Sequence, residues 1–153
     1  MKVSVVYASM LILLFGSCEK QNLKDPVTLI FGEAYGFCAG DCAHFFEING
    51  NNLYKDNIEN YYGDKLTFDD TSMPAADYAL AKDLLTNFPQ YLLDHTNQTI
   101  GCPDCTDQGG IHIFYRTGLV EYFWHIDTFV DNQPVEIRDY LKQMRDVTAA
   151  LKN

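Results

Sequence analysis

The chain has 153 residues and is strongly acidic: 21 Asp and Glu residues face 11 Lys and Arg residues, giving a formal net charge of −10 at pH 7. Proteins bind nucleic acid by neutralising its phosphates with Lys and Arg, so this composition argues against a nucleic-acid partner. With 10 Tyr and 10 Phe, the chain is too aromatic to be disordered, and it is large enough for one domain with its own core.

The first 18 residues have the pattern of an export signal that ends in a cysteine. Lys2 precedes a mainly apolar run over residues 3–15, which is shorter than the about 20 apolar residues that span a bilayer. The small residues Gly16 and Ser17 then stand before Cys18. This segment resembles a bacterial lipoprotein signal with its lipobox.

The lipobox resemblance implies a processed and lipidated chain. Residues 1–17 would be the signal peptide, cleaved before Cys18, and residues 18–26 would be the lipidated cysteine and a polar tether. Acyl chains on Cys18 would bind the membrane by burying CH₂ groups, at about 0.8 kcal/mol each. The expected location is the bacterial cell envelope, with the outer membrane favoured over the inner one. The alternatives are an ordinary cleaved signal, or an uncleaved anchor, with Cys18 incidental.

Short strands and a hairpin are predicted for the first part of the mature chain. Residues 27–31 are β-branched and apolar and follow Pro26, and residues 43–48 form a second such run. The turn sequence Asn49-Gly50-Asn51-Asn52 joins that run to a returning strand over residues 53–55. Residues 32–40 are a glycine-rich loop, and residues 65–68 are a candidate for one more short strand.

A helix is predicted to begin at Pro74, because proline suits the first turn of a helix. Ala76, Leu80 and Leu84 are spaced i, i+4 and i+8 and would form its buried face. Pro89 would end or interrupt this helix. Residues 94–110, rich in Asn, Asp, Gly and Thr, are predicted to be a loop.

Residues 111–116 and 120–127 are predicted to pair as a second hairpin. A two-residue type II′ turn at Gly118 and Leu119 would place opposite charges, aromatic rings and two histidines across from one another. Such pairs each add about 0.2–1 kcal/mol, so this register is preferred over one shifted by a residue. The three pairs are Arg116 with Glu121, Phe114 with Phe123, and His112 with His125. The other side would face the core, with Ile111, Ile113, Tyr115, Val120, Tyr122, Trp124 and Ile126.

The last predicted element is a helix that begins at Gln133 and Pro134. Its apolar stripe has helical 4-3-4-3 spacing. The stripe consists of Ile137, Leu141, Met144, Thr148 and Leu151. The order β-β-β-α-β-β-α, built on hairpins, predicts a single α+β domain over residues 27–153, with a largely antiparallel sheet and both helices on one face. The opposite face would be open or covered by another part of the chain.

Four cysteines remain once Cys18 is set aside, and they form two close pairs. An exported chain meets an oxidising compartment, so structural disulfides are expected, and four cysteines allow three connectivities. We favour the local pairs, Cys38 with Cys42 and Cys102 with Cys105, although pairing across the two motifs is also possible. The alternatives are a zinc site of four thiolates and a redox-active Cys102 and Cys105 pair. Asp104 and Asp107 disfavour the redox pair, because negative neighbours raise a thiol pKa.

The second cysteine motif carries a resemblance. The sequence Gly101-Cys102-Pro103-Asp104-Cys105-Thr106-Asp107-Gln108-Gly109-Gly110, followed by a hairpin with Trp124-His125-Ile126-Asp127, resembles an uncharacterised family of exported Bacteroidota proteins. The stretch from Phe31 to Cys42 also fits that family, so the similarity covers most of residues 27–151. It implies one secreted domain and assigns no catalytic residue.

A partner surface is predicted on the open side of the second hairpin. Its members are His112, Phe114, Phe123 and His125, and exposed aromatic residues on a sheet mark interfaces. The two histidines are expected to be half-exposed sheet residues, with a metal pair or a pH-sensitive patch as the less favoured reading. No motif predicts a cofactor or a metal. The sequence therefore predicts a lipid-anchored binding or accessory protein rather than an enzyme, with an unidentified protein as its partner.

Overall fold

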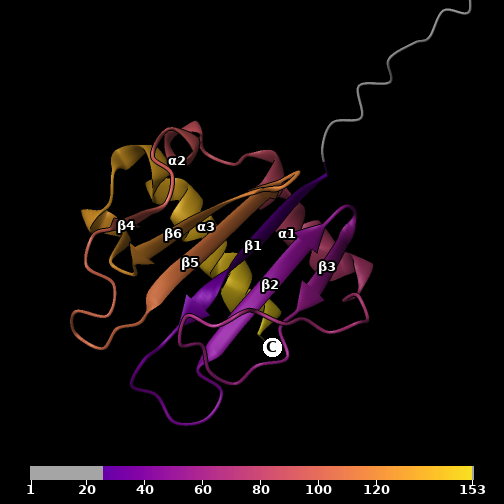
Figure 1. Ribbon diagram of the computed structural model, residues 1–153, viewed down its shortest axis with the longest axis horizontal. Helices are drawn as coiled ribbons and strands as arrows, with labels where there is room; N and C mark the ends of the chain where they lie inside the picture. Colours follow the sequence, from indigo (N-terminus) through magenta and orange to yellow (C-terminus); the bar gives the residue numbers. More distant parts are fainter. Residues whose placement is uncertain (1–25, 153) are drawn as a thin grey trace, which may run out of the picture.

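A mixed sheet with the strand order β3-β2-β1-β5-β6-β4 forms the centre of the protein (Figure 1). The computed structural model describes residues 26–152, so the predicted signal, Cys18 and all of the tether except Pro26 lie outside the described residues. Every pair of neighbouring strands is antiparallel except β4 and β6, which are parallel. The predicted α+β fold with a largely antiparallel sheet is confirmed. The strands are β1 Val27–Ala34, β2 Ala43–Asn49, β3 Asn52–Lys55, β4 Gln98–Ile100, β5 Gly110–Thr117 and β6 Val120–Asp127.

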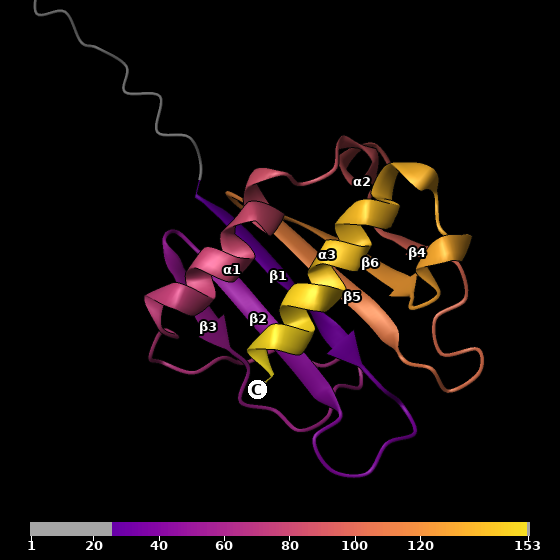
Figure 2. The same cartoon turned by 180° about the vertical axis from the view of Figure 1, so that it is seen from behind.

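The helices α1 (Ala75–Thr86) and α3 (Val135–Leu151) lie over the same face of the sheet, as Figure 2 shows and as the sequence predicts. The short helix α2 (Gln90–Asp94) precedes β4 in the chain, and the short helix η1 (Val130–Asn132) follows β6. The predicted stripe of α3 is buried, and Tyr140 is buried beside it. Within residues 26–152, no helix combines the length and the apolar character that crossing a bilayer would require.

The β5–β6 hairpin has the predicted register. Gly118 has a φ of 57° and begins a two-residue turn between Thr117 and Val120. Leu119 is not among the described residues with a positive φ, so the turn has the type II′ pattern of a positive φ at the first position only. The glycine at that position thereby fixes the alignment of both strands. The predicted core side packs beneath α1 and α3, with Val120 as the exception: it is 49% exposed because it stands at the turn, beyond the helices. The fully buried members are Ile111, Ile113, Trp124 and Ile126.

Four local predictions are wrong. Residues 32–34, predicted as the start of the glycine-rich loop, continue β1 to Ala34. The buried face of α1 contains Ala81 and Leu84, whereas Ala76 is exposed and Leu80 is 52% exposed. Apolar residues occur on more than one side of this helix, so spacing alone selects the wrong phase. Residues 98–100, predicted as loop, form β4, and residues 65–68 contribute only an isolated bridge between Asp56 and Phe68.

The face of the sheet opposite α1 and α3, called the outer face below, is covered in part by residues 56–68, called the covering segment (Figure 1). The side chain of Asp56 accepts a hydrogen bond from the backbone N–H of Phe45, and Cys42 N–H donates to the Glu59 carbonyl at 2.7 Å. These bonds tie the segment to β2. The apolar side chains that pack between the segment and the sheet are Ile58, Tyr61, Leu66 and Phe68 with Ile30, Ala34, Ala43, Phe45 and Phe114.

Candidate functional site

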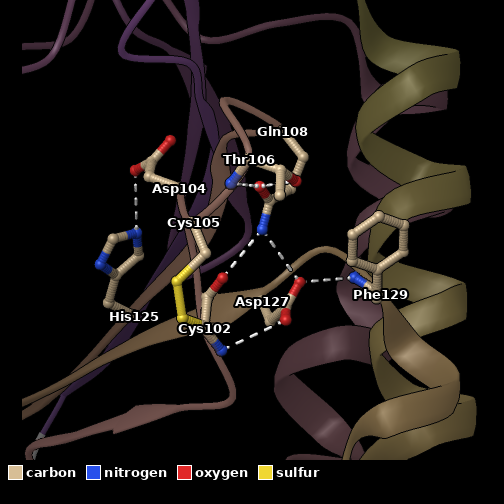
Figure 3. The surroundings of a disulfide bond; sticks show 8 residues. All are labelled: Cys102, Asp104, Cys105, Thr106, Gln108, His125, Asp127 and Phe129. Atoms are coloured by element: carbon tan, nitrogen blue, oxygen red, sulfur yellow. Dashed lines mark hydrogen bonds and ion pairs between the residues drawn. A yellow bond between two sulfur atoms is a disulfide. The ribbon is translucent and has the colours of Figure 1, made fainter.

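Residues 101–110, called the motif loop, fold around the carboxylate of Asp127 at the end of β6 (Figure 3). Asp127 accepts hydrogen bonds from the backbone N–H groups of Phe129 at 2.9 Å and Cys102 at 3.2 Å, and from the Gln108 amide at 3.4 Å. Burial would raise the pKa of Asp127, but these three hydrogen bonds outweigh it and hold the pKa below its usual value. The carboxylate is therefore the centre around which the loop is built.

The remaining residues of the motif loop also have structural roles. Gln108 donates to the Cys102 carbonyl at 2.8 Å and accepts from the N–H and hydroxyl of Thr106. A Cβ at Gly109 would lie 2.4 Å from the Tyr35 ring, and one at Gly110 would lie 2.1 Å from His125 Nε2. Glycine is required at both positions, and the motif acts as a scaffold that brings the loop close to His125.

Both local cysteine pairs are joined as disulfides. The Cα atoms of Cys38 and Cys42 are 5.7 Å apart, and those of Cys102 and Cys105 are 5.5 Å apart. The predicted connectivity is confirmed, and it leaves no free thiolate among these four for a zinc site. The second pair is followed by β5, so no helix N-terminus follows the motif to lower a thiol pKa.

His112 and His125 stack across β5 and β6, with ring centroids 4.2 Å apart and an interplanar angle of 17°. His112 is only 6% exposed, so its prediction as a half-exposed residue is wrong: the covering segment and its cross-strand neighbours bury it. Burial, and to a smaller extent the neighbouring His125, lowers the pKa of His112 to about 3. Burial also lowers the pKa of His125, although Asp104 opposes this with a carboxylate oxygen 3.8 Å from Nε2.

The stacked arrangement is poorly suited to binding a metal ion. The lone pairs of nearly parallel imidazoles lie in nearly parallel planes, so they do not converge on one ion. Among residues 26–152, no group of three or more His, Cys, Asp or Glu side chains is placed to hold a metal. The two rings instead belong to an aromatic cluster.

A cavity of about 310 Å³, called the histidine pocket, opens on this aromatic cluster. Tyr61 from the covering segment meets His112 edge to face at 5.1 Å, and Phe123 stacks on His112 at 6.1 Å. Asp104 is the only acidic residue among the described residues that line the pocket. The residues lining the pocket are Ala34, Gly36, Tyr61, Tyr62, Gly63, Asp104, His112, Phe123 and His125.

The four predicted surface residues are thus brought together, but they do not form an open surface. Phe114 contacts Phe123 at 4.9 Å and lines a neighbouring cavity of about 460 Å³, which shares Tyr61 and Gly63 with the histidine pocket. Sequence reasoning missed Tyr61 and Tyr62, because the covering segment has no regular pattern. It considered Asp104 as a neighbour of the cysteines and not as part of this site.

A third and larger cavity, of about 710 Å³, lies beside α3 and η1. Its buried carboxylate, Glu33, accepts hydrogen bonds from Arg145 Nε at 2.8 Å and from the Tyr35 hydroxyl at 2.8 Å. Arg145 also donates to the Thr128 carbonyl at 3.0 Å. These partners satisfy Glu33 and fasten α3 to the end of β1, so we assign this ion pair a structural role.

Comparison with known proteins provides no family assignment. No protein-family model matches the chain, and no curated protein matches it significantly. The histidine pocket is therefore the candidate site on the strength of its own geometry.

The central role of Asp127 predicts a specific loss of stability. Replacement Asp127→Asn removes the charge that the three hydrogen bonds stabilise, so the free energy of unfolding at pH 7 should fall by about 1.5–3 kcal/mol in urea denaturation. Because the folded pKa is depressed, the contribution of Asp127 is present above its unfolded pKa of about 3.9 and is lost as the pH falls toward the folded value. The variant should therefore lose less stability than the original protein on acidification.

Asp131→Asn is the matched control, since the Asp131 side chain is 91% exposed and only 3.7 Å from the exposed Lys142. It removes the same charge and should change the free energy of unfolding by less than about 0.5 kcal/mol. Equal effects of the two replacements would contradict the role assigned to Asp127.

Proposed function

We propose that the protein is a lipid-anchored protein of the bacterial cell envelope whose α+β domain binds a ligand or a partner chain at the histidine pocket. The observation that carries the binding role is the pocket itself. Aromatic and imidazole rings line it, one carboxylate stands at its side, and its volume lies near the lower end of the about 300–1,000 Å³ of ligand pockets.

The lining chemistry favours binding over catalysis. Of the nucleophiles used in covalent catalysis, Ser, Thr, Cys and Lys are absent from the described residues that line the pocket. His112 has a pKa of about 3 and is uncharged near neutral pH. It therefore offers a flat stacking surface instead of a proton for exchange at physiological pH.

The location rests on the first 18 residues and on the disulfides. The lipobox resemblance supports lipid attachment at Cys18, and the resemblance to exported Bacteroidota proteins agrees with it. Two disulfides within one chain suit an oxidising compartment outside the cytoplasm. The polar residues from Glu19 to Asp25 would act as the tether between the lipid and β1.

A thiol–disulfide oxidoreductase is the enzymatic alternative, because Cys102 and Cys105 are both exposed. The setting of this disulfide supports the structural role more strongly. Asp127 and Gln108 bond to the backbone of Cys102, and the motif continues into a strand.

The anchor predicts that Cys18→Ala changes where the protein partitions. Expressed with its own leader in a Gram-negative host, the original chain should enter the detergent phase of a phase-separation assay, because its acyl chains are buried in the micelle. The variant should remain in the aqueous phase or with the inner membrane as an unprocessed precursor. Mass spectrometry of the N-terminal peptide should show acyl groups on Cys18. An unmodified Cys18, in a chain that still binds membranes, would refute the anchor.

The binding role predicts where small aromatic fragments bind the full chain in detergent. Fragments should shift the NMR signals of the Tyr61, His112 and His125 rings. Phe123→Ala removes one ring of the pocket and should lower the affinity of the best fragments about 3- to 10-fold. This range is the fold-change that corresponds to the about 0.5–1.5 kcal/mol of an aromatic pair.

Phe129→Ala is the control, because Phe129 is 55% exposed and lines the other large cavity instead. It should leave fragment affinity at the histidine pocket unchanged. A backbone amide spectrum of each variant checks that the fold is intact. Fragments that bind only around Glu33 and Arg145 would overturn the assignment of the histidine pocket as the site.

A further inference from the structure

We propose that the histidine pocket receives an organic ammonium group, with Asp104 as its counter-ion and the surrounding rings as its walls. This inference rests on the proposed function and names the chemical class of its ligand. The shared chemistry is an alkylammonium group, which belongs either to a small amine or to a lysine side chain of a partner chain.

The walls of the pocket are suited to a cation. Tyr61, Tyr62 and Phe123 line it together with the two stacked imidazoles. The face of an aromatic ring is electronegative and attracts a cation within about 6 Å of its centroid, most strongly where water is displaced. No Lys or Arg side chain is among the lining residues, so the described pocket contains no permanent positive charge that would compete.

Asp104 supplies the charge that an uncharged aromatic pocket lacks. The motif loop holds it beside His125, with the carboxylate pointing toward that ring in Figure 3. Gly36 also lines the pocket, and a Cβ at Gly36 would lie 4.0 Å from an oxygen of this carboxylate. The Asp104 side chain is 42% exposed, and its one ion-pair partner among the described residues is His125, whose pKa is lowered. A ligand cation would therefore find this carboxylate without a competing Lys or Arg.

The two imidazoles contribute ring surface to the pocket and not hydrogen bonds. Nδ1 of His112 and Nε2 of His125 have no hydrogen-bond partner among the described residues, but both atoms are buried and so are not open to a ligand. Burial lowers the pKa of both rings, so neither adds a positive charge near neutral pH that would repel a cation. Ring walls and a carboxylate together favour an ammonium over a neutral or anionic ligand.

The inference is tested by titrating the full chain in detergent with n-butylammonium and with uncharged 1-butanol. The readouts are isothermal calorimetry and the ring signals of His125. Butylammonium should bind at a single saturable site and shift these signals, whereas butanol should bind at least about tenfold more weakly. A short peptide with one central lysine forms a second arm. Tighter binding of the peptide assigns a partner chain as the source, and binding of butylammonium alone assigns a small amine.

Two aspartates of the motif loop provide matched variants. Asp104 and Asp107 both have a φ of 58°, a conformation that asparagine tolerates, so neither replacement strains the loop. Asp104→Asn should weaken the binding of butylammonium by about tenfold or more, since it removes a charged hydrogen-bond acceptor. Asp107→Asn removes the same charge outside the pocket and should change the affinity less than about twofold. Equal weakening by both variants would show only a general effect of acidity and would overturn the inference.

A ring variant tests the walls independently of Asp104. Tyr62 is 76% exposed, so Tyr62→Leu should fold normally, yet it should weaken butylammonium about 2- to 5-fold through the lost ring. Phe129→Leu removes a ring elsewhere and should have no effect. If butanol binds as well as butylammonium, the cation inference fails while the proposed binding role stands. If neither probe nor the aromatic fragments bind at the pocket, both fail.

Discussion

The structure depends on how the chain covers the outer face of its sheet. The helices α1 and α3 both lie on the other face, which leaves Ile30, Phe45 and Phe114 on a surface that water would otherwise reach. Fully burying one such side chain stabilises the folded protein by about 1.5–3 kcal/mol. The covering segment provides that burial, because Asp56 ties its start to β2 and Phe68 bridges back to Asp56.

The position of the pocket follows from the extent of that cover. Tyr61 reaches over His112 and buries it, whereas Tyr62 is 76% exposed. Beyond these residues, Phe123 and His125 on β6 are only partly buried. The histidine pocket is thus the place where the cover of the sheet ends. Aromatic and imidazole rings beside the small core on the outer face form the walls of this cavity.

The motif loop closes the other side of this cavity. Its most distinctive residues act through geometry: Asp127 holds the loop, the disulfide joins Cys102 to Cys105, and Gly110 allows close contact with His125. The consequence is the position of Asp104 beside the stacked imidazoles. A sequence motif that resembles a metal or redox site therefore builds one wall of the histidine pocket.

Sequence patterns predicted the parts of the fold that short-range pairing determines. Opposite charges on Arg116 and Glu121, with the glycine turn at Gly118, were enough to set the hairpin register. The stripe of α3 was readable because its polar face is well separated from its apolar face. The face of α1 was not, since alanine and leucine occur around the helix and only tertiary packing selects Ala81 and Leu84.

The site was less predictable, because its members come together through long-range contacts. The strand β4 has three residues and depends on Asn97, which has a φ of 57° and accepts the Phe123 N–H at 3.0 Å. The covering segment has no period that indicates which side chains point inward. The stacking of His112 and His125 follows from the register, whereas the burial of His112 depends on Tyr61, some 50 residues away in the sequence.

The most direct test of this account is the protonation of His112, followed by NMR of its ring signals in the full chain as the pH is lowered. A ring buried beneath Tyr61 and stacked on His125 should stay neutral, with signals unchanged from pH 8 to pH 5, because its pKa is about 3. A titration centred near the ordinary histidine value of about 6.5 would show that water reaches the ring. That result would contradict the covered outer face and the aromatic pocket built on it.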